Sequence, residues 1–283
     1  MARIGVTPAG GAAAIEGAAA DVAPWIVRLA RVGYAAKATF YILIGLLAAR
    51  TAFGTGGETT DSRGAMRLIE EGPGGSATLA VIGVGLLGYA LWRLVAAATN
   101  AEGRDPDAKG AALRAGTAAK GVTHGWLGVV ALVAAMRAGG AAEGNQTRDW
   151  STRVFEWPMG RWLVIAGGLA VVGYGLYQLY RATRRDKLEK RLDLHEAGPT
   201  AHDWILHLGQ FGVAARGIVF GVIGFIVARA AWRYQPAQAG GVEQSLDLLG
   251  DMGPPVLGIV GAGLVAYGVF ELAEARYRRI RIT

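Results

Sequence analysis

Three cations recur at equivalent places in the chain, each directly after a run of small residues. The three phrases are Gly33-Tyr34-Ala35-Ala36-Lys37, Gly116-Thr117-Ala118-Ala119-Lys120 and Gly212-Val213-Ala214-Ala215-Arg216. A tyrosine follows each phrase at a nearly constant spacing, and these residues are Tyr89, Tyr174 and Tyr267. Ammonium, guanidinium and phenol groups all donate hydrogen bonds, so a convergent set would bind a phosphate or a carboxylate. The six side chains are therefore the candidate site for an anion or a lipid headgroup.

A structural interpretation competes with this anion site, and the sequence favours it. Each cation lies about one turn inside a long apolar segment. From there its stem can lie along a helix while the charge reaches the lipid headgroups. The tyrosines would then belong to an aromatic belt at the membrane surface. On this interpretation Lys37 lies at headgroup depth, and any binding role depends on which way the three cations point.

Few other polar residues lie in the apolar segments. His124 aligns with Tyr41 and Phe220 of the other repeats, so we interpret it as a packed ring with one hydrogen bond. The carboxylate of Glu271 lies near the same end of the third repeat as Arg216, and we expect the two to pair. The scarcity of acidic residues in these segments argues against an ion-coupled pump and against most membrane hydrolases.

The sequence predicts no metal, no cofactor and no enzymatic activity. The chain has no cysteine, which excludes disulfides and thiolate chemistry. Zinc would need a set of nearby ligands, and no nearby carboxylate set completes a metal site with the histidines. These histidines are His195, His202 and His207. No arrangement of nucleophile, base and orienting group stands out.

Six apolar segments must position the candidate residues. Each is close to the roughly 20 helical residues that cross a hydrocarbon core of about 30 Å. Helix is the form that satisfies backbone polar groups without water. The composition agrees, because 52% of the residues are hydrophobic and only 18% are charged. We predict an all-α membrane protein with six transmembrane helices, approximately at residues 34–53, 77–98, 118–136, 162–180, 213–232 and 255–273.

The six segments form three hairpin repeats. Each repeat holds an even number of spans, so the repeats are parallel and are related by a pseudo-threefold axis along the membrane normal. We divide the chain into a disordered Ala/Gly-rich tail and three repeats, the last of which includes a long polar connection. The ranges are 1–24, 25–100, 101–185 and 186–283. Aligned Gly-x-x-x-Gly pairs at Gly121 and Gly217 predict close helix packing.

The basic residues predict the orientation and the surroundings. Lys and Arg concentrate on the side that holds both termini, which places this side in the cytoplasm. The net charge is +7, but the basic residues adjoin apolar segments. They therefore favour anionic lipid headgroups of the bilayer as partners and not nucleic acid. Each connection within a hairpin also holds a short amphipathic patch before Pro73, Pro158 or Pro254, which we expect to lie at the interface.

The repeated phrases resemble those of a known bacterial family, the domain-of-unknown-function family 1206. The resemblance rests on the small-Ala-Ala-[Lys/Arg] phrase, the Gly-Tyr-x-[Leu/Val]-aromatic phrase and the link Trp157-Pro158-Met159-Gly160-Arg161-Trp162-Leu163, and it covers about residues 28–280. It implies six spans and bacterial origin, and it implies no known chemistry. We expect a non-enzymatic membrane module that binds lipid or a partner membrane protein. The alternative is a small transporter or channel with a pathway along the repeat axis.

Overall fold

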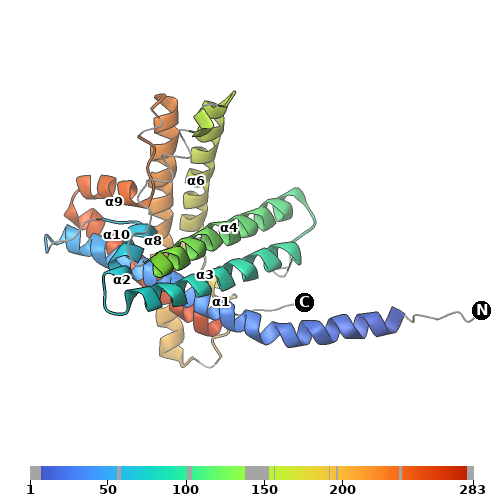
Figure 1. The fold of residues 1–283 in the computed structure, drawn as a ribbon. Helices are drawn as coiled ribbons and strands as arrows, with labels where there is room; N and C mark the ends of the chain where they lie inside the picture. Colours follow the sequence, from blue (N-terminus) through green and yellow to red (C-terminus); the bar gives the residue numbers. More distant parts are fainter. Residues whose placement is uncertain are drawn as a thin grey trace, which may run out of the picture.

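Nine helices account for the fold in the part of the chain described by a computed structural model (Figure 1). Six of them are long and apolar enough to cross a membrane, which confirms the predicted class. These are α1 (Pro8–Ala52), α3 (Gly75–Ala98), α4 (Ala108–Arg137), α6 (Gly160–Ala182), α8 (Pro199–Trp232) and α10 (Pro254–Tyr277). The shorter helices are α2 (Ser62–Glu70), α7 (Arg185–Glu189) and α9 (Val242–Asp251). The described residues are 8–55, 59–100, 104–137, 153–155, 157–190, 192–195, 197–235 and 238–278.

The first helix begins earlier than the sequence predicts. Its backbone is helical from Pro8, so α1 includes most of the 1–24 segment that we expected to be a disordered tail. Alanine has the highest helix propensity and is abundant in this segment. A proline at the first helical position also costs no hydrogen bond, because that N–H group has no partner within the helix. Residues 1–7 lie outside the described part of the chain.

The spanning helices pair between repeats more extensively than within them. We call α1, α4 and α8 the leading helices, and α3, α6 and α10 the returning helices. Each leading helix packs along the returning helix of the preceding repeat, and α1 closes the cycle by packing on α10. Figure 1 shows two of these pairs, α3 beside α4 and α6 beside α8. This cyclic pairing is the pseudo-threefold arrangement that the repeats predict.

Glycines at equivalent positions bring the paired helices together. The three contacts are Gly45 with Gly261, Gly128 with Gly83, and Gly224 with Gly168. A Cβ atom on Gly261 would lie 2.8 Å from the carbonyl oxygen of its partner, and the corresponding distances are 3.0 Å for Gly83 and 2.9 Å for Gly168. Side chains cannot approach a backbone that closely, so each pair depends on glycine. The same contact therefore recurs three times around the axis.

A second layer of small residues lies toward the membrane side that holds the chain termini, which we call the terminal side. There Gly121 contacts Ala90, and Gly217 contacts Gly175. A Cβ atom would lie 3.1 Å from the Ala90 oxygen in the first contact and 2.9 Å from the Gly175 oxygen in the second. Both glycines thus lie on close-packing faces, as their spacing predicts.

The contacts within the hairpins differ from one repeat to another. Helix α1 packs on α3 and α8 packs on α10, but α4 and α6 have no comparable contact. Gly33 packs against Tyr89, and Gly212 packs against Tyr267 in the same way. The equivalent Gly116 has no neighbour within 4 Å of an added Cβ atom. Among the described residues the second hairpin is therefore open, and we call the space between α4 and α6 the second-repeat gap.

The hydrophobic core lies in the half of the bundle that is farther from the chain termini. We call this end of the bundle the hairpin side. The core contains side chains of five spanning helices, among them Phe40, Ile44 and Leu264. The short helices α2 and α9 insert Met66 and Leu246 into this core, and both side chains are fully buried. The patches before Pro73 and Pro254 thus form short helices whose apolar side chains pack on the bundle. In the patch before Pro158, Glu156 lies outside the described residues.

A second apolar cluster covers the terminal end of the third repeat. It joins the connection after α6 to α8 and α10 through Leu188, Leu192, Leu206 and Phe270. The connection is also tied to the end of α10, because the Asp193 amide donates a hydrogen bond of 2.7 Å to the Tyr277 carbonyl. The polar connection is therefore an integral part of the bundle.

Candidate functional site

The fold turns the repeated cations toward the centre of the bundle. Lys37 is only 6% exposed and Arg216 is 8% exposed, while Lys120 is half-buried. For Lys37 and Arg216, this burial corrects the expectation that the cations extend to the headgroups. For Lys37 and Arg216, the neighbouring helices supply tyrosine hydroxyls and ring faces, which stabilise a cation away from water. The structure thus brings the predicted cations and tyrosines together.

Lys37 contacts both returning helices that flank α1. Its ammonium donates a hydrogen bond of 3.0 Å to the Tyr267 hydroxyl and forms an ion pair of 2.5 Å with Glu271. It also lies 5.7 Å from the centre of the Tyr89 ring. The partner of Glu271 is therefore Lys37 and not the predicted Arg216. The cause is the pairing of helices, because α10 packs along α1 of the first repeat.

Arg216 has hydroxyl and aromatic partners. Its Nε donates to the Tyr41 hydroxyl at 2.9 Å and its Nη1 donates to the Tyr174 hydroxyl at 3.2 Å. The guanidinium also lies 5.1 Å from the centre of the Tyr267 ring and 4.6 Å from that of Phe220. No carboxylate pairs with Arg216 within the described ranges. Its charge is thus held by oxygen dipoles and ring faces alone.

Lys120 is the least satisfied of the three cations. Its ammonium lies 5.5 Å from the centre of the Tyr174 ring, in a cation–π contact. Among the residues that the structure describes, neither a carboxylate nor a hydroxyl reaches it. Lys120 belongs to α4, which borders the second-repeat gap. Its ammonium therefore keeps donors for a further ligand.

Aromatic pairs support the cations with the same threefold relation. Tyr41 lies against Tyr267 at a centroid distance of 4.6 Å, and the two equivalent pairs are Tyr89 with His124 at 4.9 Å and Tyr174 with Phe220 at 5.2 Å. The Nδ1 atom of His124 lies 2.8 Å from the Lys120 carbonyl oxygen. This geometry agrees with the interpretation of His124 as a packed ring. Tyr41 was not among the candidate residues predicted from the sequence, although it contacts Arg216 and its alignment with His124 was the available signal.

Three cations and three tyrosines thus form one arrangement, which we call the axial cluster: Lys37, Lys120, Arg216, Tyr89, Tyr174 and Tyr267. Glu271 is the carboxylate that this cluster contacts directly in the described chain. The positions equivalent to Glu271 hold Arg93, which donates to the Tyr89 hydroxyl at 2.9 Å, and Gln178. Gln178 is 1% exposed, and its Nε2 atom has no hydrogen-bond partner among the described residues. Positive charge and hydrogen-bond donors are therefore in excess at the cluster.

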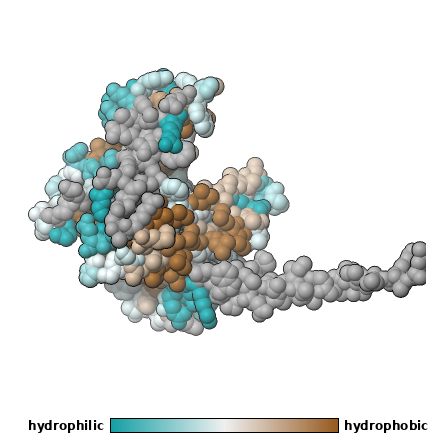
Figure 2. Space-filling model, viewed as in Figure 1, coloured by the Kyte–Doolittle hydropathy of each residue, from teal (hydrophilic) through white to brown (hydrophobic). Residues whose placement is uncertain are grey.

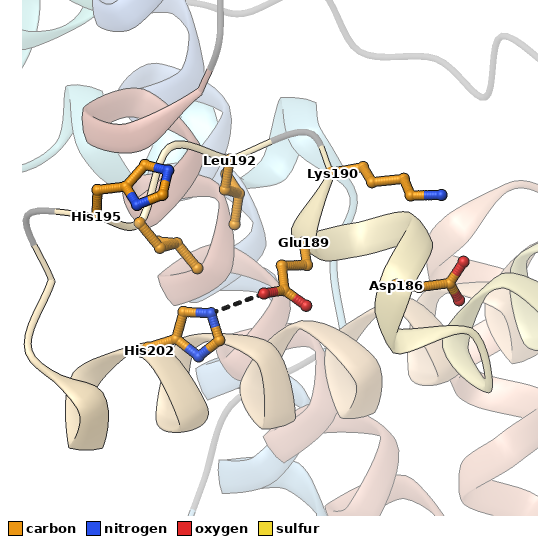
Figure 3. Close-up of a pocket in the computed structure, with 7 residues that line it drawn as sticks. Asp186, Glu189, Lys190, Leu192, His195 and His202 are labelled. Atoms are coloured by element: carbon orange, nitrogen blue, oxygen red, sulfur yellow. Dashed lines mark hydrogen bonds and ion pairs between the residues drawn. The ribbon is translucent and has the colours of Figure 1, made fainter.

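The three histidines of the polar connection do not converge on a metal site. His195 and His202 line a pocket of about 480 Å³ with Glu189 and Asp186. Figure 3 shows His202 facing Glu189, and its Nε2 atom lies 3.0 Å from the carboxylate. His207 lines a different pocket, beside Trp204. In the described parts of the chain, no group of three or more acidic or histidine side chains is placed to hold a metal ion.

The fold and the axial cluster define a multi-pass membrane protein built from three two-helix repeats. The chain belongs to the DUF1206 family, described as a domain of unknown function, whose model matches residues 32–100, 115–185 and 211–278. This match confirms the resemblance found in the repeated phrases. The chain is also 29% identical over 262 residues to the uncharacterized protein YxxB of Bacillus subtilis (strain 168), with 92% of this chain and 94% of that protein covered. No solved structure matches the chain.

Proposed function

We propose that the protein is a non-enzymatic membrane module whose axial cluster binds an anionic group, carried by a lipid or by a partner membrane protein. The observation that carries the proposal is that Lys37, Lys120 and Arg216 converge on shared tyrosines, whereas Lys37 alone of the three contacts a carboxylate, that of Glu271, among the described residues. A buried charge is costly unless it is paired and hydrogen-bonded. A bound phosphate or carboxylate supplies the negative charge that the described residues do not.

Transport along the repeat axis is the less favoured function. The cations lie toward the terminal side of the bundle. Between them and the hairpin side lies a layer of apolar side chains. On α1 these are Phe40 and Ile44, which follow Lys37 by about one and two turns, and on α10 Leu264 precedes Tyr267 by one turn. A pathway for an ion would have to cross this apolar layer, where a charge is strongly disfavoured.

The anion proposal is tested with purified protein in detergent, to which phosphatidylglycerol or phosphatidylcholine is added. Native mass spectrometry then measures the lipid that the protein retains. We expect phosphatidylglycerol to be retained in preference, and Lys120→Gln to weaken its binding roughly tenfold, because a hydrogen bond to a charged group contributes about 1.5–3 kcal/mol. The matched control is Lys109→Gln, an exposed lysine near the start of the same helix, which should bind like the wild type.

Equal retention of both lipids by the wild type, or equal affinity of the Lys120→Gln and Lys109→Gln variants, would contradict the proposed anion site. Liposomes that contain the protein provide the second measurement. An ion flux through them that Lys37→Gln abolishes would reverse the order of the two functions.

We further propose that the terminal side faces the cytoplasm of the inner membrane, on the basis of its excess of Lys and Arg. Because the chain contains no cysteine, single introduced cysteines report the orientation. In intact cells, a membrane-impermeant maleimide should label Thr55→Cys, between α1 and α2, and leave His195→Cys unlabelled. Inverted vesicles should show the opposite pattern, and the reverse of both results would place the termini outside.

A further inference from the structure

We propose that the second-repeat gap is a lateral binding site for one anionic phospholipid, with its headgroup at Lys120 and an acyl chain between α4 and α6. The inference rests on the proposed function and deepens it. It names a lipid as the source of the anion, and it names the gap as the opening through which the lipid reaches the axial cluster. Three observations support it: an exposed inner face, missing core side chains and an unpaired cation at the edge of the gap.

The inner face of the second hairpin is exposed where the other two hairpins are closed. Trp92 in the first repeat is 4% exposed and Phe270 in the third is 1% exposed, whereas the equivalent Tyr177 is 43% exposed. Gly116 shows the same difference, since its equivalents Gly33 and Gly212 pack against tyrosines and it has open space beside it. Apart from the cation–π contact between Lys120 and Tyr174, the two helices of the second repeat thus present unpartnered faces to each other in the described structure.

The sequence of the second repeat removes the side chains that fill this space elsewhere. Where the first and third repeats have Phe40 and Val219, each 3% exposed, the second repeat has Thr123, which is exposed. Where they have Ile82 and Val260, the second repeat has Gly167, beside which the structure leaves nothing within 4 Å of an added Cβ atom. The second repeat thus lacks two apolar side chains at positions that are buried in the other repeats, and this leaves room that an acyl chain can occupy.

Outside the gap, the surface of the second repeat is apolar enough to lie in the hydrocarbon core. Exposed Val122, Trp126 and Val129 lie along α4, and Leu169 and Leu176 lie along α6. Figure 2 shows an apolar surface over the part of the bundle where α3 and α4 lie. An opening that faces hydrocarbon is filled by lipid chains and not by water. The gap is therefore continuous with the lipid phase.

Charge complementarity selects an anionic lipid as the occupant. Lys120 is half-buried on α4, in contrast to its enclosed equivalents Lys37 and Arg216. A phosphate beside Lys120 would meet the ammonium and Tyr174, and its acyl chain would extend toward Thr123 and Gly167. A helix of a second copy would fill the apolar space but would leave the charge of Lys120 unmatched.

The test restores the missing side chains and measures the retained phosphatidylglycerol by native mass spectrometry. The double variant Thr123→Phe/Gly167→Ile gives the second repeat the residues of the first, and we expect about tenfold weaker binding because the added groups exclude the chain. The control is Val129→Phe, which adds the same ring to an exposed position of α4 and should leave binding unchanged. If the double variant binds phosphatidylglycerol normally while Lys120→Gln remains defective, the lateral acyl-chain site is overturned and the anion site at Lys120 stands. A Lys120→Gln variant that binds normally overturns the anion site itself.

Cysteine protection provides a second measurement that does not depend on the folding of the double variant. In the otherwise cysteine-free chain, Gly116→Cys should react with a maleimide in detergent, and phosphatidylglycerol should slow the reaction more than phosphatidylcholine does. Ala108→Cys, exposed at the start of α4, should react equally in all conditions. Protection of Gly116→Cys by dimerisation without lipid, detected as a doubled mass, would instead identify a second copy as the occupant and overturn the proposal.

Discussion

Replacement of Glu271 with alanine is expected to lower the free energy of unfolding by about 3–5 kcal/mol, the range for breaking a buried ion pair from one side. Glu271 is 1% exposed and Lys37 is 6% exposed, so the substitution leaves an ammonium in the bundle without its counterion. The measurement is the unfolding transition of the purified protein in mixed micelles, followed by circular dichroism. A decrease of less than about 1 kcal/mol, the size of an exposed ion pair, would contradict the buried-pair geometry.

Two control variants separate the ion pair from other effects of the substitution. Asp203→Ala breaks an exposed ion pair with Arg185 at the start of α8 and should cost no more than about 1 kcal/mol. The double variant Lys37→Met/Glu271→Leu removes both charges and should recover most of the lost stability, because an apolar pair of similar volume replaces a buried ion pair at little cost. A double variant as unstable as Glu271→Ala would show that packing and not charge determines the effect.

Replacement of Gly168 with leucine is expected to separate α6 from α8 and to destabilise the protein by about 3 kcal/mol, the upper end of the range for overpacking. An added Cβ atom would lie 2.7 Å from the Ala228 amide nitrogen and 2.9 Å from the Gly224 carbonyl oxygen. Both are backbone atoms, so no side-chain rotation can relieve the clash. The extent of the contact makes the effect large, because α6 packs mainly on α8.

The matched control for this substitution lies on the same helix. Gly173 has no neighbour within 4 Å of an added Cβ atom and is exposed. Gly173→Leu should therefore leave the unfolding transition unchanged or raise it slightly, because leucine has a higher helix propensity than glycine. Equal destabilisation by the two substitutions would mean that helix propensity or membrane insertion, and not the α6–α8 contact, is responsible.

The candidate residues were predictable, but their orientation was not. The repeat alignment selected all six members of the axial cluster because equivalent positions hold equivalent residue types. A position one turn inside a span is compatible with a side chain that extends to the headgroups and with one that turns inward. The favoured outward interpretation was wrong for Lys37 and Arg216, because both are enclosed by tyrosines from neighbouring helices.

The partner of Glu271 shows why contacts between repeats were harder to predict. Proximity along the chain suggested Arg216, since both residues belong to the third hairpin. The observed partner, Lys37, is separated from Glu271 by most of the chain. The cyclic pairing of leading and returning helices brings these two residues together. The lengths of the apolar segments do not show which helices pair, so this contact could not be predicted from them. The open second hairpin was missed for the same reason, although Thr123 and Gly167 were visible as small residues at aligned positions.

The amino-acid sequence by itself determined the class, the six spans and the threefold repetition, because the bilayer imposes a minimum apolar length and requires internally satisfied backbone groups. Only the tertiary structure decided which way Lys37, Lys120 and Arg216 point, which helices touch and which hairpin stays open. Those properties depend on the rotation of each helix about its axis. That rotation is set by the glycine contacts between helices far apart in the chain, such as Gly45 with Gly261.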